Sequence, residues 1–417
     1  MERALLVGVY IGREPRREAE ESLEELKVLS QSAGAEVIGE VLQHRDRINP
    51  KYYIGEGKLN EIKVMVKELG ADIIIFDDKL SPAQYKNLEN KINMRIIDRS
   101  QLILDIFAQR AKSIEGKLQV ELAQLLYILP RLVGKGVELS RLGGGIGTRG
   151  PGEKKLEYER RRIRDRIAKI KKELKNIEKR RNLHRKKRKK QPIPFVSLAG
   201  YTSAGKTTLF NMLTSEGAKV SSYLFSTLDP LTRIIELKNG LKFYLSDTVG
   251  FIKKLPVELV EAFKSTLDEI VYTDLILHII DYSRYDYQKQ IDSVEKILSE
   301  IGAADKNIIR VYNKIDLISE GEKLVNKNGE KEVFVSASKA WGIEKLLKGL
   351  EKTIFADFKL YRIKIKSRFK TFMEGINNWG FIVKKHNNGD EIIYEVYIKY
   401  EDMLKFLPKL KGKGEII

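Results

Sequence analysis

The feature that most constrains the fold is a strand, a glycine-rich turn and a helix in direct succession at residues 195–214. The apolar run FVSLA predicts a buried strand, and the pattern LFNMLTSE that starts at Leu209 predicts a helix. Between them, residues 200–207 read GYTSAGKT, which matches the pattern G-x-x-x-x-G-K-[ST]. A strand that enters a helix through such a turn is typical of an α/β domain.

The composition of the turn is that of a phosphate-binding loop. Glycines allow consecutive backbone N–H groups to surround phosphate oxygens, and the positive end of the following helix adds to their field. Lys206 would then reach the β and γ phosphates, and the Thr207 hydroxyl would be a ligand of Mg²⁺. A chance glycine turn with a surface lysine is the alternative, and the flanking strand and helix count against it. The expected phosphate-binding residues are Gly200, Tyr201, Thr202, Ser203, Ala204, Gly205, Lys206, Thr207 and Thr208.

A second motif, DTVG, follows the turn after about forty residues. A DxxG motif by itself is weak evidence for a nucleotide site, but this position after a phosphate-binding loop makes it stronger. It comes directly after the strand-like run 241–246. A carboxylate at the end of a strand can hold Mg²⁺ directly or through water, and the glycine would lie near the γ-phosphate. The residues of this motif are Asp247, Thr248, Val249 and Gly250.

Two further motifs, NKID and SAS, concern the base of the nucleotide. NKID follows a strand-like run, and its carboxylate can accept two N–H hydrogen bonds from the edge of guanine. Adenine cannot supply these donors, and a buried carboxylate left unpaired disfavours its binding strongly. Asp316 therefore favours GTP over ATP, because an ATP-binding P-loop protein leaves this motif unexplained. In SAS, a backbone N–H can bind the guanine oxygen. The expected base-binding residues are Asn313, Lys314, Ile315, Asp316, Ser336, Ala337 and Ser338.

The composition narrows the class of protein. The 417 residues carry 77 Lys and Arg against 58 Asp and Glu, a formal charge of +19, so we expect an anionic partner. The absence of Cys excludes disulfides, thiolate metal sites and cysteine nucleophiles, and four scattered His do not indicate a zinc site. The first residues lack the features of a signal peptide, and no apolar run approaches the ~18 residues that span a bilayer. We expect a cytoplasmic protein with no membrane span.

Most of the excess charge lies in one segment. Residues 154–190 contain 20 Lys or Arg against five acids, a net of +15, which leaves +4 for the other 380 residues. A heptad-like apolar seam predicts one long helix there. The seam consists of Leu156, Ile163, Ile167, Ile170, Leu174 and Ile177. A comparable stripe covers 103–129, and the glycine-rich stretch 141–153 separates the two, so we predict a helical hairpin with a basic tip.

We infer from the asymmetry of this charge that the hairpin binds nucleic acid. A solvated charged helix face and a basic tail without a specific partner are the alternatives. The charge alone does not distinguish RNA from DNA. Association with a membrane surface is disfavoured, because a partner helix already explains the apolar seam.

The segments on either side predict two smaller units. Over residues 1–100, β-branched runs alternate with helical patterns, which predicts a parallel α/β sheet. The sequence GEGK at 55–58 opens one of these helices and could hold a phosphate on backbone N–H groups. We favour a plain glycine turn, because the motif lacks the full dinucleotide fingerprint. Near the end of the chain, Asn388 and Gly389 between alternating runs predict a hairpin in an α+β unit. The expected domains are 1–100, 101–190, 191–356 and 357–417.

Several blocks outside the generic nucleotide motifs resemble the HflX family of GTPases. In the first half they are DRSQLILDIFAQRAKSIEGKLQVELAQLLY at 98–127, PRLVG, and RLGGGIGTRGPGE with the following LEYERRRIRDRI. In the second half they are FSTLDPLTR, DTVGFIKKLP, and VEAFKSTLDEI followed by DLILHIIDYS. The resemblance extends over most of the chain.

The resemblance implies an N-terminal α/β domain with a long antiparallel helical hairpin, a Ras-like P-loop GTPase domain and a small α+β C-terminal domain. It implies binding to the large ribosomal subunit and its rRNA, in ribosome dissociation, rescue or assembly. It also implies that Thr227 in the first switch loop closes on Mg²⁺ in the GTP state. The switch residues are Phe225, Ser226, Thr227, Leu228 and Asp229. The resulting catalytic set is Lys206, Thr227 and Gly250, and the metal ligands are Thr207, Thr227 and Asp247.

Two positions limit what the resemblance implies for the mechanism. Family members commonly have Asn where this chain has Ser203, so we do not expect potassium to stimulate hydrolysis. Phe251 follows DTVG in place of a glutamine, so no side chain there can orient the attacking water. We predict a monomeric, slow GTPase that binds the large subunit in its GTP state. The alternative is a general RNA-binding or remodelling protein in which nucleotide binding is regulatory.

Overall fold

The computed structural model describes residues 1–134, 151–188, 192–214, 230–254, 256–318 and 331–417. Each of its two compact units is built from more than one stretch of chain. The first includes Met1–Ile177 and Ile252–Lys264, and the second includes Glu178–Val220, Pro230–Phe251 and Ser265–Ile417. The short segment Ile252–Lys264, which directly follows the DTVG motif and Phe251, therefore groups with the N-terminal residues.

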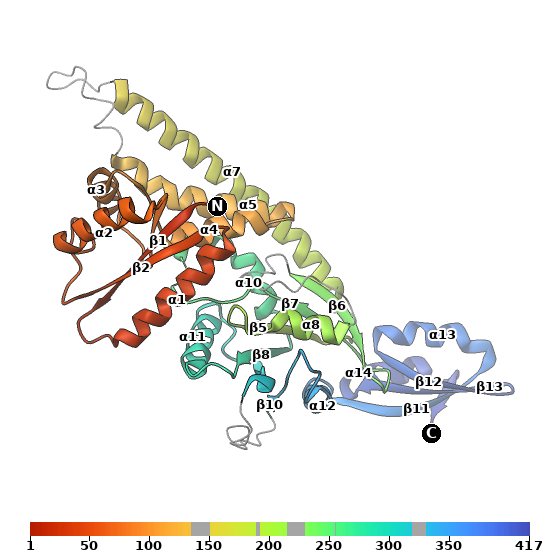
Figure 1. Ribbon diagram of the computed structural model, residues 1–417. Helices are drawn as coiled ribbons and strands as arrows, with labels where there is room; N and C mark the ends of the chain where they lie inside the picture. Colours follow the sequence, from red (N-terminus) through yellow and green to blue (C-terminus); the bar gives the residue numbers. More distant parts are fainter. Residues whose placement is uncertain (135–150, 189–191, 215–229, 255, 319–330) are drawn as a thin grey trace. The chain divides into compact units, whose positions relative to one another are not determined.

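The N-terminal sheet is parallel, which confirms the prediction from the alternating pattern. Its strand order is β2-β1-β3-β4, and every pairing is parallel. The elements are β1 (Arg3–Ile11), α1 (Arg16–Ser32), β2 (Glu36–Arg45), α2 (Glu56–Leu69), β3 (Ile73–Phe76), α3 (Pro82–Ile92) and β4 (Arg95–Asp98). Strand β3 is buried along its whole length, as expected where helices cover both faces of a sheet (Figure 1).

The GEGK sequence lies at the start of α2. Gly55 is the residue before the helix, and its N–H donates to the Gln43 side chain at 3.0 Å. A Cβ at this position would lie 2.6 Å from the Arg45 guanidinium. The glycine is therefore explained by close packing of two side chains against the turn.

The predicted first arm of the hairpin consists of two α-helices rather than one. Helix α4 (Arg99–Arg110) ends before Ala111, which has extended backbone, and α5 (Ile114–Ile128) begins after Ser113. The Ser113 hydroxyl accepts a hydrogen bond from the Gly116 N–H at 2.8 Å, a normal N-cap. The apolar stripe is therefore interrupted, because this cap starts a new helix. The short helix η1 (Leu129–Gly134) follows.

The second arm is the single long helix α7 (Pro151–Arg188), about 57 Å long at about 1.5 Å per residue (Figure 1). It begins inside the stretch expected to be non-helical, because proline is favoured in the first helical position. Ile167 and Ile170 of the seam are buried. The Arg166 guanidinium donates two hydrogen bonds of 2.6 Å to the Glu121 carboxylate of α5. The expected tip lies outside the described residues, apart from Pro151–Glu153.

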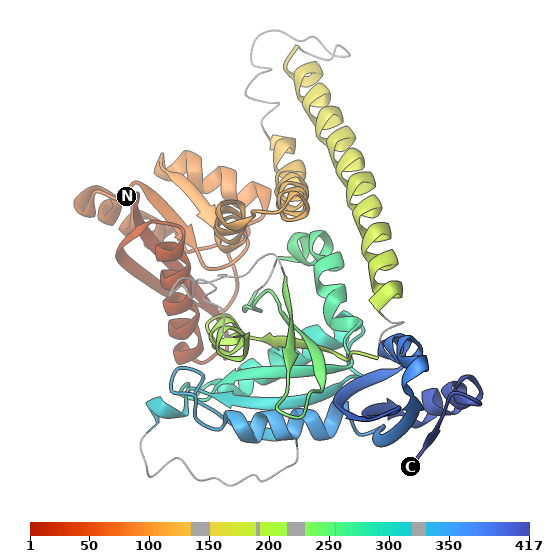
Figure 2. The same ribbon diagram turned by 90° about the vertical axis from the view of Figure 1, so that its right-hand side faces the viewer.

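The central sheet of the second unit has six strands in the order β10-β9-β8-β5-β7-β6, and only the β6–β7 pairing is antiparallel. The strands are β5 (Phe195–Gly200), β6 (Leu231–Glu236), β7 (Lys242–Asp247), β8 (Leu275–Asp281), β9 (Asn307–Asn313) and β10 (Glu332–Phe334). The helices are α8 (Lys206–Thr214), α10 (Lys264–Val271), α11 (Tyr287–Glu300), η2 (Ile315–Leu317) and α12 (Ile343–Ile354). Helices flank the sheet on both faces (Figure 2). Because β5 lies between β7 and β8, ligands are expected beyond the carboxyl ends of these strands.

The C-terminal sheet is antiparallel, with strand order β12-β13-β11-β14. Its elements are β11 (Phe358–Lys366), η3 (Ser367–Phe369), α13 (Lys370–Glu374), η4 (Gly375–Asn378), β12 (Gly380–Asn388), β13 (Glu391–Lys399), α14 (Tyr400–Leu410) and β14 (Gly414–Ile416). Gly389, with φ of +62°, lies in the turn between β12 and β13, which confirms the predicted hairpin. The mixed α/β class and all three sheet types agree with the sequence.

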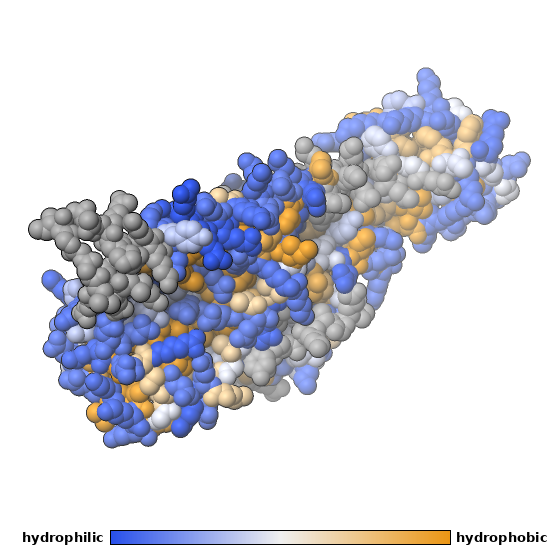
Figure 3. All heavy atoms as spheres, turned by 90° about the horizontal axis from the view of Figure 1, so that it is seen from above, coloured by the Kyte–Doolittle hydropathy of each residue, from blue (hydrophilic) through white to orange (hydrophobic). Residues whose placement is uncertain are grey.

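The surface of α7 combines a narrow apolar stripe with a broad basic one. Arg161, Lys172 and Lys179 are exposed and share the helix face opposite the buried isoleucines. Leu183, beyond the end of the seam, is 61% exposed. Hydrophilic side chains dominate the view from above (Figure 3). No helix in the described ranges is both long enough and apolar enough to cross a membrane.

Burial of the α7 seam generates a test of helix packing. Ile170 is fully buried, so Ile170→Ala should lower the free energy of local opening of α7 by about 2–5 kcal/mol. Amide hydrogen exchange along the helix measures this opening. The control Leu183→Ala removes an exposed side chain from the same helix and should change the opening free energy by less than about 0.5 kcal/mol. Equal effects would contradict the packing described here.

Candidate guanine-nucleotide site

The P-loop is a tight turn between β5 and α8 that requires unusual backbone angles. Gly200, Ser203 and Gly205 have positive φ values of 153°, 60° and 95°. A Cβ at Gly200 would collide with the Ile279 carbonyl oxygen, and one at Gly205 would collide with the Asn313 side-chain amide. Both glycines of the motif are therefore needed for close packing as well as for backbone geometry.

Lys206 is the buried cation of this loop. Its side chain is 6% exposed, and its ammonium donates to the carbonyl oxygens of Gly200 at 3.1 Å and Tyr201 at 2.8 Å. Burial lowers the pKa of Lys206 to about 8, although the charge of Asp247 opposes this change. An anion beside this ammonium would stabilise its charged form.

Thr207 and Asp247 form a pair of oxygen donors where α8 begins and β7 ends. The Thr207 hydroxyl donates to Asp247 Oδ2 at 2.8 Å, and the carboxylate is buried. A hydroxyl and a carboxylate are the hard oxygen ligands that Mg²⁺ accepts, so the donor set fits this ion. The described ranges contain no cluster of three acidic or His side chains, and a bound Mg²⁺ would take its other ligands from phosphate and water.

The DTVG segment lies directly against the P-loop. The Phe251 N–H donates to the Gly200 carbonyl at 3.0 Å, and the Thr202 N–H donates to the Phe251 carbonyl at 2.7 Å. A Cβ at Gly250 would lie 3.0 Å from Lys206 Nζ. The Phe251 side chain is 2% exposed, so it packs into the protein. Thr248, in the middle of the motif, donates its hydroxyl to the Leu198 carbonyl at 2.6 Å.

Asn313 ties the P-loop to the SAS turn. Its Nδ2 donates to the Ala204 carbonyl at 2.8 Å, and its Oδ1 accepts from the Ala337 N–H at 2.9 Å. Lys314, which has φ of +65°, donates to Asp281 Oδ2 at 2.7 Å. The side chains of NKID therefore hold the two loops in register as well as presenting a carboxylate.

Asp316 presents that carboxylate beside the SAS turn. Hydrogen bonding from the Ser336 side chain is the main cause that lowers the pKa of Asp316, against a smaller effect of burial. The Ser338 hydroxyl lies 3.4 Å from Asp316 Oδ2. The lowered pKa favours the charged carboxylate, which can accept hydrogen bonds from two N–H donors.

The structure brings together the P-loop, DTVG, NKID and SAS motifs within the second unit. Residues 225–229, the expected first switch loop with Thr227, lie outside the described residues. Sequence reasoning missed Asp281, which accepts from Lys314 and from the Ser283 hydroxyl. The sequence feature that could have identified Asp281 is its position as the last residue of the buried run LILHIID, at the carboxyl end of β8.

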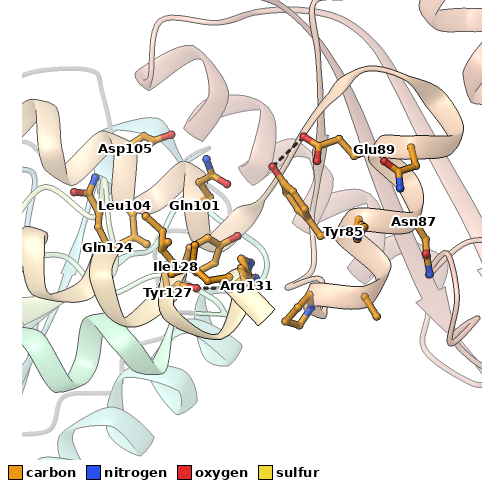
Figure 4. A pocket seen from close by; sticks show the side chains of 15 residues that line it. Tyr85, Asn87, Glu89, Gln101, Leu104, Asp105, Gln124, Tyr127, Ile128 and Arg131 are labelled. Carbon is orange, nitrogen blue, oxygen red and sulfur yellow. Dashed lines mark hydrogen bonds between the residues drawn. The ribbon is translucent and has the colours of Figure 1, made fainter. Parts of the chain in front are cut away.

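The first unit contains a cavity of about 650 Å³ that none of the four motifs lines. It lies among α3, α4, α5 and η1, and Tyr85, Gln101 and Arg131 are among its lining residues (Figure 4). The Arg131 guanidinium stacks on Tyr127 at 3.5 Å from the ring centroid and pairs with Asp98 at 3.1 Å. These contacts explain the arginine as part of the packing of η1.

Family models match most of the chain. Residues 20–108 match the family described as GTP-binding GTPase N-terminal, and residues 110–188 match the GTP-binding GTPase middle region. Residues 195–314 match the family described as 50S ribosome-binding GTPase.

Individual relatives match over nearly the full length. A GTPase HflX from Caldanaerobacter subterraneus subsp. tengcongensis is 49% identical, over 92% of this chain and 90% of its own. GTPase HflX from Escherichia coli is 43% identical, over 87% and 85%. A crystal structure of a GTP-binding protein from Sulfolobus solfataricus in complex with GDP is 27% identical, with a TM-score of 0.45 over 85% of this chain and 99% of that chain. On the family models and the identity to the bacterial relatives, the chain belongs to the HflX family of GTPases.

Proposed function

We propose that the chain binds GTP at the four-motif site and hydrolyses it to GDP and phosphate. The observation that supports this most directly is Asn313, whose two hydrogen bonds join the phosphate loop to the loop expected around the base. One nucleotide can occupy both ends of a site held in this way. Thr207 and Asp247, together with Thr227, would hold Mg²⁺, which neutralises phosphate charge when bound.

The residues of the chain contribute mainly electrostatic stabilisation. The Lys206 ammonium is buried, and exchanging two carbonyl contacts for phosphate oxygens would place its charge against the charge that develops in the transition state. Backbone N–H groups of the P-loop and of Gly250 would add to this stabilisation. Phe251 is buried and has no polar group, so it cannot orient water. We therefore propose slow hydrolysis until a partner completes the site.

We further propose that the partner is the large ribosomal subunit, bound in the GTP state in the cytoplasm, with α7 on rRNA. Two observations support this proposal. The description of the family that matches residues 195–314 includes 50S ribosome binding. The segment 154–190 carries +15 of the net charge of +19. The proposed process is ribosome dissociation, rescue or assembly.

Base selection is tested at Asp316. Asp316→Asn replaces one acceptor oxygen by a donor, so it should weaken GTP binding and favour xanthine nucleotides. We expect the ratio of the GTP and XTP affinities to shift by about 10- to 100-fold, as is typical of buried hydrogen-bond mismatches. Equilibrium binding of fluorescent GTP and XTP to the full chain measures the ratio. Lys348→Ala, a change at an exposed residue of α12, is the control. Unchanged GTP preference in the Asn variant would remove Asp316 from its assigned role.

Ribosome binding is tested by co-sedimentation. The full chain should sediment with purified large subunits in the presence of a non-hydrolysable GTP analogue and much less with GDP. Small subunits provide the control. Absence from the pellet with both nucleotides would contradict the ribosomal proposal, and tight, nucleotide-insensitive binding to unstructured RNA would favour general RNA binding instead.

The role of α7 is tested by removing charge from its exposed face. Replacing Arg161, Lys172 and Lys179 by Gln should weaken subunit binding and reduce the slope of log affinity against log salt by up to about 2–3, since each phosphate contact contributes about 0.7–0.9. The matched control replaces Lys345, Lys348 and Lys352, three exposed lysines of α12, by Gln. A salt slope that changes equally in both triple variants would show that α7 has no specific electrostatic role.

A further inference from the structure

A buried carboxylate outside the four motifs contacts the lysine of NKID. Asp281 is the last residue of β8, and in the parallel sheet it is the register partner of Asn313, the last residue of β9. The Asp281 side chain is 9% exposed, and its Oδ2 accepts a hydrogen bond from the Lys314 ammonium at 2.7 Å. The sheet therefore places this carboxylate directly beside the start of NKID.

The Asp281 carboxylate is oriented by contacts that do not involve Lys314. Its Oδ1 accepts hydrogen bonds from the Ser283 hydroxyl at 2.5 Å and from the Ser283 N–H at 3.2 Å. The N–H of Tyr282, the residue between them, donates to the Asn313 carbonyl at 3.0 Å. One oxygen of the carboxylate is thus fixed by the chain around it, and the other oxygen is directed at the ammonium.

The backbone of Lys314 has a conformation that needs support. Its φ of +65° and ψ of +31° are left-handed, which is unfavourable for a non-glycine residue because its Cβ approaches the following carbonyl oxygen. Lys314 is also the cap of η2, and its carbonyl accepts from the Leu317 N–H at 3.0 Å. Because η2 contains Asp316, the conformation of Lys314 determines where the carboxylate of NKID is directed.

The other contacts of NKID act on either side of Lys314. Asn313 is fixed by its two side-chain hydrogen bonds, and the Ile315 N–H lies 3.4 Å from the Val335 carbonyl, a long distance for such a bond. The contact between Asp281 and Lys314 is shorter, and both of its groups are charged, which makes such hydrogen bonds about twice as strong as neutral ones. The Lys314 side chain is therefore restrained mainly by Asp281.

We propose that Asp281 is a positioning residue for recognition of the guanine base. It acts through Lys314: the ion pair holds the left-handed conformation at the start of η2, and η2 directs Asp316 toward the base. Loss of the pair weakens the binding of GTP and GDP alike, since both carry guanine, and leaves the phosphate end of the site intact. This inference rests on the nucleotide site proposed above.

The test measures the affinities of GTP and GDP analogues with a fluorescent label on the ribose for variants of the full chain. Asp281→Asn removes the charge and keeps the volume, so it should weaken the binding of both nucleotides by about tenfold, the effect of one hydrogen bond to a charged group. KM for GTP should rise by a similar factor, while kcat stays within about twofold because the phosphate loop is unchanged.

A double-variant cycle shows whether the effect depends on Lys314. Lys314→Met removes the ammonium and keeps an unbranched side chain. In this background Asp281→Asn should change nucleotide affinity by less than about twofold, because the ion pair is already absent. A further tenfold loss in the double variant would mean that Asp281 acts by a different route, and it would overturn the proposal.

The same loop offers a matched control and a milder variant. Asp286 is also a buried carboxylate with a cationic partner, Arg284 Nε at 2.8 Å, so Asp286→Asn removes an equivalent ion pair and should leave nucleotide affinity unchanged. Ser283 is exposed, and Ser283→Ala removes one contact of Asp281 Oδ1 without replacing a buried side chain. It should weaken the binding of both nucleotides by about two- to threefold.

The outcomes separate the role of Asp281 from the nucleotide site. An unmodified chain that binds neither nucleotide would refute the proposed site. If the unmodified chain binds both, unchanged affinities in the Asp281→Asn and Ser283→Ala variants would overturn the positioning role alone, as would an equal loss in Asp286→Asn. A lower melting temperature of Asp281→Asn with unchanged affinities would show that the ion pair only stabilises the fold. If Asp281→Asn does not fold, the affinities of Ser283→Ala decide between these outcomes.

Discussion

The burial of the Lys206 ammonium is the constraint on which the second unit depends. A charged group in this position is unfavourable unless dipoles or anions surround it, and the turn supplies the carbonyl oxygens of Gly200 and Tyr201. The turn can do so only because Gly200 and Gly205 allow neighbouring backbone and side-chain groups to approach without a Cβ between them. The same geometry brings Thr207 to Asp247 and Asn313 to Ala204, so one local requirement organises both ends of the site.

Local patterns in the sequence were sufficient to predict most of the fold. Buried strands, the turn at Gly389 and the parallel N-terminal sheet follow from short-range periodicity and turn chemistry. The break between α4 and α5 was missed because the apolar stripe continues across it, although Ser113 is a recognisable cap. The start of α7 at Pro151 was also missed, because the surrounding glycines outweighed the preference of proline for a first helical turn.

The candidate site was also predicted where its residues belong to local motifs. Lys206, Asp247 and Asp316 could be assigned from motifs, because each motif keeps its chemistry within a few residues. Outside this site, the ion pair between Lys254 and Asp77 of the first unit joins residues that are 177 positions apart, and neither belongs to a pattern that predicts the other. Such a pair depends on how α9 (Val257–Ala262) and the end of β3 pack, which is information that periodicity and spacing do not carry.

The grouping of Ile252–Lys264 with the N-terminal residues has a consequence for how the protein can be divided. Leu259, Ala262 and Phe263 are buried, in a segment that packs on α5. A fragment that begins at β5 would leave this segment without its partner surface and expose apolar side chains, at about 1.5–3 kcal/mol for each large one. The nucleotide-binding part of the chain therefore has different boundaries in the sequence and in the structure. An isolated nucleotide-binding fragment would therefore differ from the full chain in the conformation around DTVG and in its solubility.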